Sequence, residues 1–447
     1  MKQILQSLKN GETLVADVPI PAPKPGTALI KTAASLVSAG TERMVVSFAE
    51  KSLFGKIRSR PELVRQMIDK ARREGVLTTL EAAFNRLDQP MTLGYSSAGT
   101  IIALGEGLYG FQVGDKVACA GGGYAVHAEY ALVPQNLMVH VPDTVDFESA
   151  AFATLGAIAL HGFRLAESQV GERVAIIGLG LVGLLAAGIA SAAGCQVLGI
   201  DLDPRRVELA NKMGVADAVV RSGAEAAARA ISRGRGMDSV LICADATSTD
   251  PVNLAAIIAR DRAHVVAVGA VDLHLPRKIY FEKELSFINS RSYGPGRYDP
   301  HYEENQQDYP VGYVRWTEGR NLEAIVDLLA NRRLNVHPLI SHRFPIEQAA
   351  QAYDLITGKL NQSFLGVLIT YSQGQITLPI SHSAHTTTEN IVKPETVNLG
   401  VLGAGNFASV VMLPVLRKIP KVKPVYICSA SGVSAYSAAK KYGFVSA

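Results

Sequence analysis

Three glycines at the end of a short apolar run are the residues of this sequence best suited to chemistry. Gly178, Gly180 and Gly183 form the pattern G-x-G-x-x-G within VAIIGLGLVG, after a predicted buried strand and before a predicted apolar helix. In such a turn the first glycine permits the tight bend, the second lets backbone approach a pyrophosphate, and the third lets the helix pack on the strand. The helix N-terminus then offers unpaired N–H groups to phosphate oxygens. The pattern predicts a dinucleotide-binding loop, whose other residues are Leu179, Leu181 and Val182.

A carboxylate follows this loop at the end of the next predicted strand. The run QVLGID ends at Asp201, where an acid accepts hydrogen bonds from the ribose 2′-hydroxyl of a dinucleotide. Its negative charge would repel the 2′-phosphate of NADP, so the sequence predicts NAD as the cofactor and disfavours NADP. Arg205 and Arg206 are an alternative phosphate site, but they follow Pro204 and are predicted to begin a helix.

A second glycine loop lies further along the chain. VNLGVLGAGNFASV contains Gly403 and Gly405, with Ala408 in third place. The next predicted strand ends at Cys428 and Ser429, where an acid would bind ribose. We therefore predict cofactor binding at Gly403 and Gly405 and leave the choice between NAD and NADP open there.

Polar and aromatic residues gather where the alternating strands and helices end. The predicted substrate-binding residues are Arg291, Tyr293, Arg297, Tyr298 and His301. Aromatic rings stack on sugar faces and arginine pairs with carboxylate or phosphate, so the cluster suits a polyhydroxylated or anionic ligand. The alternative is a surface loop whose tyrosines pack into the core.

The predicted elements fall into several units. Short β-branched runs broken by glycine and proline indicate an all-β unit within residues 1–150, with a helical insertion at 48–90. Strands and helices then alternate over 151–290, which predicts a doubly wound parallel sheet with helices on both faces.

The remaining chain divides into three segments. Residues 291–370 are interpreted as a return to the β unit, with a helix at about 322–331. Residues 371–396 have no sustained period and are rich in Ser, Thr and Pro, which is typical of a linker. Residues 397–447 begin a second unit of strand, glycine loop and helix, so the fold class is α/β.

Composition narrows the classes of partner. The formal charge is +4 over 447 residues without a basic stripe, which argues against nucleic acid. The longest apolar stretch, 179–189, is too short to span a bilayer and the N-terminus lacks a signal-peptide pattern, so we expect a cytoplasmic protein without membrane contact. The four cysteines are isolated, which indicates neither a disulfide framework nor a four-cysteine zinc site.

The order of several motifs resembles the medium-chain dehydrogenase/reductase family, which includes zinc alcohol and polyol dehydrogenases. The motifs are ALIKTAASLVSAGTE, TLGYSSAGTIIALG, GFQVGDKV, YALVP and VAIIGLGLVG. The resemblance covers about residues 10–370. It implies a GroES-like catalytic domain built from both flanks of a central Rossmann domain, with the substrate in the cleft between them. It also implies a homodimer or tetramer.

The resemblance fails at the positions that would bind catalytic zinc. The family's three ligand positions fall on Ala39, on Tyr95 and near Thr154, and the structural zinc lobe is missing. We therefore expect a metal-free site, because alanine offers no lone pair and the histidine is replaced.

Without zinc, other groups must stabilise charge on the substrate oxygen. The resemblance places Tyr95 and Thr41 in the site, and Thr41 matches a hydroxyl that relays the substrate proton. Glu42 could orient either hydroxyl or act as a base. The alternative for Tyr95 is that it only fills the volume of the lost metal site.

The segment 397–447 resembles the start of the Gfo/Idh/MocA family of sugar oxidoreductases. That family's Glu-Lys-Pro catalytic segment would lie beyond the sequence, so the second Rossmann unit is expected to be truncated.

These observations favour a zinc-independent, NAD-dependent oxidoreductase for a secondary alcohol or ketone of a sugar, sugar nucleotide or polyol. A zinc-free enoyl or quinone reductase, which would prefer an apolar pocket and often NADPH, is one alternative. A nucleotide-sensing module that binds NAD without turnover is the other.

Overall fold

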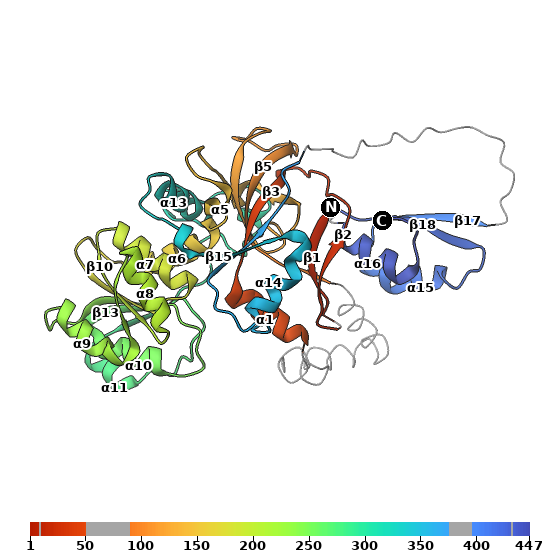
Figure 1. Cartoon of the computed structure of the whole chain (residues 1–447). Helices are drawn as coiled ribbons and strands as arrows, with labels where there is room; N and C mark the ends of the chain where they lie inside the picture. Colours follow the sequence, from red (N-terminus) through yellow and green to blue (C-terminus); the bar gives the residue numbers. More distant parts are fainter. Residues whose placement is uncertain (9, 51–89, 375–395, 431) are drawn as a thin grey trace.

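The computed structural model describes residues 1–8, 10–50, 90–374, 396–430 and 432–447. Figure 1 shows three groups of elements in a row: a sheet with helices in yellow and green, a central β unit, and a small unit in blue beside the N-terminus. Residues 51–89 of the predicted helical insertion lie outside the described part of the chain. Its first residues, 48–50, belong to helix α1 (Ala39–Glu50).

The central unit is built on a seven-stranded mixed sheet. Its strands, in spatial order, are β15 (Ile340–Pro345), β16 (Gly366–Thr370), β3 (Thr27–Val37), β5 (Ser96–Leu104), β6 (Lys116–Ala120) and β8 (Met138–His140), while β7 (Tyr130–Pro134) also pairs with β3. β16 runs antiparallel to β3, so the chain returns to this sheet after the second unit.

A smaller sheet completes this part of the fold. Its strands are β2 (Thr13–Asp17), β1 (Lys2–Gln6) and β4 (Met91–Thr92). Tyr95 immediately precedes β5 of the larger sheet, so the turn between β4 and β5 and the start of α1 carry the residues that the sequence proposed for catalysis.

The second unit is the predicted doubly wound sheet. Six parallel strands lie in the order β11 (Asp217–Val220), β10 (Gln196–Asp201), β9 (Arg173–Ile177), β12 (Met237–Ile242), β13 (Ala259–Ala267) and β14 (Ser286–Asn289). Side chains of β9 alternate between two cores: Val174 and Ile176 in one, Ala175 and Ile177 in the other. This alternation is what a parallel sheet covered on both faces requires.

The helices of this unit cover the two faces. α6 (Ala153–Leu165), α7 (Leu181–Ala192) and α8 (Pro204–Met213) contribute to the first core. α9 (Ala224–Ile231), α10 (Asp250–Ile258) and α11 (Arg277–Glu282) contribute to the second.

The segment after β14 is turn-rich and contains α12 (Pro300–Glu303), α13 (Glu318–Ala330) and α14 (Ala349–Ile356). The helix expected at about 322–331 begins at Glu318 instead. Its N-cap, Thr317, accepts a hydrogen bond from the amide of Arg320, and such a cap fixes the start of a helix.

The predicted linker at 371–396 also starts later than expected. Tyr371 is 6% exposed and its Oη lies 2.7 Å from Ser35 Oγ. Gln373 Nε2 donates a hydrogen bond to the Thr32 carbonyl oxygen. Residues 371–374 therefore pack on the central sheet, because their side chains satisfy polar groups of β3; residues 375–395 lie outside the described part of the chain.

The blue unit is a parallel pair of strands, β17 (Val397–Leu402) and β18 (Val422–Cys428), with α15 (Leu413–Leu416) and α16 (Val433–Tyr442). A π-turn at Ala408–Met412 precedes α15. Val433 and Tyr436 pack against Val18 at the end of β2, which attaches this unit to the central one. Across all described residues, no helix is both long and apolar enough to cross a membrane.

Candidate active site

The first glycine loop has the geometry expected of a dinucleotide-binding turn. Gly178 has φ +96°, in the left-handed region that favours glycine, and a Cβ there would meet the Ala244 amide at 2.6 Å. A Cβ on Gly183 would lie 1.8 Å from the Gly178 carbonyl oxygen. At Gly180 the nearest atom to a Cβ would be Arg206 Nη1 at 3.9 Å, so this glycine leaves open space beside the helix N-terminus. Two glycines thus shape the loop and the middle one leaves room for a ligand.

The other loop residues contribute through their backbone. Leu179 is fully buried in the first core, and Leu181 and Val182 pack against that core, so their side chains do not face a ligand. The Leu179 amide donates a 2.6 Å hydrogen bond to Asp201 Oδ2.

Asp201 lies at the end of β10, 8% exposed. Besides the Leu179 amide, it accepts a hydrogen bond from the Asp203 amide at 2.8 Å. Arg206 Nη1 lies 3.7 Å from Asp201 Oδ2, whereas Arg205 pairs with Asp203. α8 begins at Pro204 as predicted, and Arg206 on its first turn leans back toward the loop. The carboxylate is therefore held beside the glycine loop, with a cation next to it.

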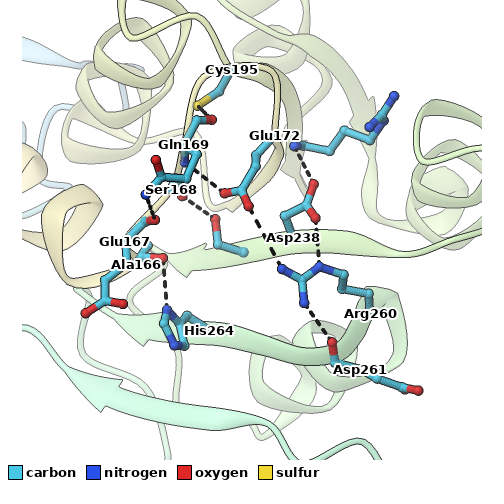
Figure 2. A network of polar contacts seen from close by, with 12 residues as sticks. Ala166, Glu167, Ser168, Gln169, Glu172, Cys195, Asp238, Arg260, Asp261 and His264 are labelled. Carbon is cyan, nitrogen blue, oxygen red and sulfur yellow. Dashed lines mark hydrogen bonds and ion pairs between the residues drawn. The ribbon is translucent and has the colours of Figure 1, made fainter.

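The opposite edge of the sheet is held by an extended polar network. In Figure 2, Asp238 accepts hydrogen bonds from the Arg173 amide and from Arg260 Nε, and His264 contacts the Ala166 carbonyl oxygen. These residues lie at or near the amino ends of β9, β12 and β13. Ligands of open α/β sheets bind at the carboxyl ends, so this network supports the sheet and the glycine loop lies on the functional side.

The proposed catalytic residues meet between the start of α1 and the turn that leads into β5. Tyr95 Oη donates a 2.6 Å hydrogen bond to Ser38 Oγ, one residue before α1 begins at Ala39. Burial raises the pKa of Tyr95 above its usual value, and its hydrogen-bonding interactions with Ser38 and Thr41 oppose that rise. Thr41 itself is exposed. The phenol is thus protonated at neutral pH and joined to two hydroxyls, one buried and one at the surface.

Glu42 does not contact either hydroxyl as the sequence suggested. Its carboxylate is 3% exposed and accepts hydrogen bonds from the Ser38 amide at 2.9 Å and from Tyr353 Oη at 2.5 Å. His127 Nε2 lies 3.2 Å from Glu42 Oε2. The carboxylate is turned into the protein because these buried donors satisfy it, and it is linked to Tyr95 through the backbone amide of Ser38 and by its charge.

His127 extends this contact into a buried chain of hydrogen-bonded side chains, which the sequence analysis did not predict. His127 is fully buried, and its Nδ1 lies 2.7 Å from Ser35 Oγ, which contacts Tyr371 Oη. Gly94, with φ +92°, lets the histidine approach, since a Cβ there would lie 2.7 Å from the His127 ring. The chain links α1, β3, α14 and the end of β16, and no local sequence pattern signals it.

Part of the predicted substrate cluster lies against this site. The Tyr298 ring lies close to two guanidinium groups, with Arg291 Cζ at 4.3 Å and Arg297 Cζ at 3.9 Å from its centroid. Arg297 Nη2 also approaches Gly122 in the loop after β6. In the same loop, the Gly121 amide donates a 3.0 Å hydrogen bond to the Tyr95 carbonyl oxygen. The Arg291–Tyr298–Arg297 stack therefore lies beside the loop that bonds the backbone of Tyr95.

The other two predicted substrate residues are not part of the exposed stack, although Arg297 Cζ lies 5.8 Å from the centroid of the Tyr293 ring. Tyr293 is 2% exposed, so it packs into the core as the alternative interpretation held. His301 is exposed on the short helix α12 and its amide bonds to Asp299, without a described contact to Tyr95 or Tyr298.

An unexpected buried acid lies behind the stack. Glu318 is fully buried, and neither its carboxylate oxygens nor the Tyr293 hydroxyl have a hydrogen-bond partner of good geometry among the described residues. Burial raises the pKa of Glu318 to about 8, and the nearby Glu303 carboxylate adds to that rise. Arg297 forms an ion pair with Glu303, which is 6% exposed.

The second glycine loop is more open than the first. Gly403 has φ +99°, and its amide donates to the Cys428 carbonyl oxygen at 2.9 Å. A Cβ on Gly403 or Gly405 would meet no atom within 4 Å. The tight approach seen at Gly183 is not repeated there, and cofactor binding at this loop stays a prediction.

Comparison with known proteins agrees with this geometry. A model of the zinc-binding dehydrogenase family matches residues 182–306, and a model of the alcohol dehydrogenase GroES-like domain matches residues 69–143. The chain carries zinc-type alcohol dehydrogenase domains. The predicted combination of a GroES-like β unit with a Rossmann-type sheet is thereby confirmed.

Individual relatives of this medium-chain dehydrogenase type are distant. The D-xylulose reductase of Scheffersomyces stipitis is 25% identical over 315 residues, 60% of this chain and 80% of that protein. The galactitol 1-phosphate 5-dehydrogenase of Escherichia coli is 28% identical over 298 residues, 59% of this chain and 80% of that protein. The crystal structure of galactitol-1-phosphate dehydrogenase from Escherichia coli has a TM-score of 0.62 at 25% identity, covering 83% of this chain and 100% of that one.

The zinc-type dehydrogenase fold implies a catalytic metal, and the side chains at the corresponding positions do not suit one. Ala39 has no donor atom, the Tyr95 hydroxyl is bonded to Ser38, and Thr154 Oγ1 donates to the Cys119 carbonyl oxygen at 3.2 Å. Zinc in proteins is bound by thiolate, imidazole or carboxylate. Within the described residues no three histidines, cysteines or acids gather closely enough to hold a metal ion.

Proposed function

We propose that this chain is an NAD-dependent oxidoreductase that acts on a secondary alcohol, or its ketone, of a sugar, sugar nucleotide or polyol, without catalytic zinc. The observation that carries the proposal is the Tyr95 hydroxyl, hydrogen-bonded to Ser38 at a position where a zinc-type dehydrogenase would have a metal ligand. The two relatives reported above, a D-xylulose reductase and a galactitol 1-phosphate 5-dehydrogenase, support the sugar-alcohol class.

The residues around the first glycine loop fit a dinucleotide. The open space at Gly180 would admit the pyrophosphate, and the Asp201 carboxylate lies where it would accept the ribose hydroxyls. Arg206 weakens the preference for NAD over NADP, because its guanidinium lies beside the Asp201 carboxylate and could bind the 2′-phosphate of NADP. When bound, the nicotinamide ring supplies the hydride acceptor or donor.

On the substrate side, three hydroxyls would carry the proton. A substrate hydroxyl that donates to Tyr95 Oη would find that atom already donating to Ser38 Oγ, with the exposed Thr41 hydroxyl as the second neighbour. As the substrate is oxidised, Tyr95 would take the proton of the substrate oxygen and pass its own proton to the exposed Thr41 hydroxyl, which would release a proton to water. The raised pKa keeps the phenol protonated, so in the reverse direction it would act as the acid.

The polar character of the cleft favours this function over an enoyl or quinone reductase. Two arginines flank Tyr298 beside Tyr95, whereas a reductase of activated C=C bonds would have an apolar pocket.

The test follows nicotinamide absorbance with purified protein, NAD or NADP, and a panel of polyols, sugars, sugar phosphates and sugar nucleotides, before and after chelator treatment. Metal content is measured on the same samples. Chelator-insensitive reduction of NAD by one of these compounds, at a zinc content far below one per chain, is the expected result. Turnover that tracks bound zinc would overturn the metal-free part, and cofactor binding without any turnover would favour the nucleotide-sensing alternative.

A further inference from the structure

The arginines near the proposed active site differ in whether a carboxylate pairs with the guanidinium. Three of them face a carboxylate, and the pairs are Arg43 with Asp245, Arg206 with Asp201, and Arg297 with Glu303. The first of these pairs joins α1 of the β unit to the loop after β12, across the domain boundary. Each of these cations is therefore largely neutralised before any substrate arrives.

Arg291 is different. It follows β14 by two residues, at the carboxyl edge of the parallel sheet, and its side chain is exposed. Its guanidinium lies on the Tyr298 ring and forms no ion pair with an acidic residue in the described part of the chain. A guanidinium whose face rests on an aromatic ring keeps its N–H edge free, and that edge matches a phosphate or carboxylate in two parallel hydrogen bonds.

Tyr298 holds this cation in a defined place. It has φ +69°, a conformation that is unusual for a bulky residue and persists only where the surroundings enforce it. Arg297 Cζ also lies 3.9 Å from the ring centroid, and Arg297 is ion-paired with the buried Glu303. Tyr298 is nevertheless 54% exposed, and Arg297 beside it approaches Gly122 in the loop that bonds the Tyr95 backbone. Arg291 is thus a preorganised cation at the edge of the site that contains the Tyr95 hydroxyl.

We propose that Arg291 binds an anionic group of the substrate, a phosphate or a carboxylate, while the reacting carbinol lies at Tyr95. The inference rests on the proposed function and narrows it: the substrate would be a phosphorylated or acidic sugar or polyol and not a neutral one. Arg297 is already ion-paired with the buried Glu303, which leaves Arg291 as the cation of the stack available to the ligand.

The experiment compares matched substrates that differ in charge: galactitol with galactitol 1-phosphate, and sorbitol with gluconate. kcat/KM is measured for wild type, Arg291→Met and Arg291→Lys. Arg315→Met is the control, because Arg315 is also exposed and lies on an aromatic ring, that of Trp316 at 3.8 Å, outside this stack.

The wild type is expected to prefer the anionic member of at least one pair. Arg291→Met should reduce that preference, the ratio of kcat/KM for the anionic member to kcat/KM for the neutral member, by roughly tenfold to a hundredfold, the usual effect of losing a hydrogen-bonded charge. Arg291→Lys should restore part of the preference through KM, and Arg315→Met should behave like wild type. The phosphate and carboxylate pairs distinguish which anion is bound.

Equal kcat/KM for both members of each pair, or a preference that survives in Arg291→Met, would overturn the inference while the proposed function stands. If no compound is turned over, the proposed function fails, and thermal melts with NADH and the same pairs decide the inference separately. Stabilisation by the anionic member that depends on Arg291 would support the binding site, and its absence would rule it out.

Discussion

Tyr95 and Ser38 are joined by a 2.6 Å hydrogen bond in which the phenol is the donor. The Ser38 amide in turn donates to Glu42 Oε1 at 2.9 Å. The phenol is therefore fixed at the start of α1 by a residue that is itself held by a buried carboxylate. This relationship joins the proposed catalytic hydroxyl to the interior of the β unit.

The glycine loop provides a matched pair of variants. Gly183→Ala should destabilise the fold by about 3 kcal/mol or more, since its Cβ would clash with the Gly178 carbonyl oxygen. Gly180→Ala should leave the melting temperature unchanged and weaken NADH binding about tenfold, because its Cβ would occupy the space left for the pyrophosphate. Melting curves and fluorescence titration with NADH separate the two effects. A Gly180→Ala protein that binds NADH normally would place the cofactor elsewhere.

Asp201→Asn should reverse the choice of cofactor. The change removes the charge that would repel a 2′-phosphate and releases Arg206 to bind it, so kcat/KM should fall about tenfold with NAD and rise with NADP. Asp203→Asn is the control, because Asp203 is a neighbouring carboxylate that pairs with Arg205. The same response in both variants would contradict the assignment of Asp201.

Tyr353→Phe should destabilise the β unit by about 1.5–3 kcal/mol, the usual cost of losing a hydrogen bond to a charged group. The lost bond is the one from Tyr353 Oη to the buried Glu42 carboxylate. Tyr313→Phe is the matched control, since Tyr313 is 92% exposed. Equal chemical denaturation curves for both variants would show that the buried chain does not contribute to stability.

Glu318→Gln should stabilise the protein in a way that depends on pH. The pKa of Glu318 rises from an ordinary value of 4.5 to about 8 on folding, so only the unfolded chain releases the proton between these values. Wild type therefore loses stability as pH rises from about 4.5 to 8, by up to roughly 4 kcal/mol, and the amide variant does not.

The difference in melting temperature between Glu318→Gln and wild type should grow from pH 5 to pH 8 and then level off. The groups around Glu318 that share this environment are Tyr293, Arg297, Glu303, Tyr302 and Tyr309. Of these, Glu303 is already paired with Arg297. A melting-temperature difference that stays constant with pH would mean that Glu318 is ionised in the folded protein.

The sequence was sufficient for features whose cause is local. G-x-G-x-x-G followed by an acid predicts the loop because each glycine answers a steric demand within a few residues, and Gly178 and Gly183 have those demands in the structure. The alternation of strands and helices likewise predicts the parallel sheet. The predicted start of the helix and the predicted start of the linker were less accurate, because side-chain contacts determine both. Thr317 caps α13, and Tyr371 packs on β3.

The sequence was insufficient where partners are far apart. Glu42 meets Tyr353 across 311 positions and His127 across 85, so its burial could not be inferred from its neighbours. The members of the predicted substrate cluster also differ in exposure because their packing partners are distant in the sequence. Tyr293 and Tyr298 lie in one run of aromatic residues, but tertiary packing buries the first and exposes the second.

The most direct measurement of the central claim is the kcat of Tyr95→Phe on protein whose zinc content has been determined. The account predicts a fall of about a hundredfold or more with NADH affinity unchanged, because the phenol proton acts on the reacting oxygen and takes no part in binding the cofactor. The melting temperature should fall only slightly, since the change removes one neutral hydrogen bond, that to Ser38. Thr41→Ala should give a smaller loss in the same assay. An undiminished kcat in Tyr95→Phe would contradict the account and leave the tyrosine as a residue that only fills space.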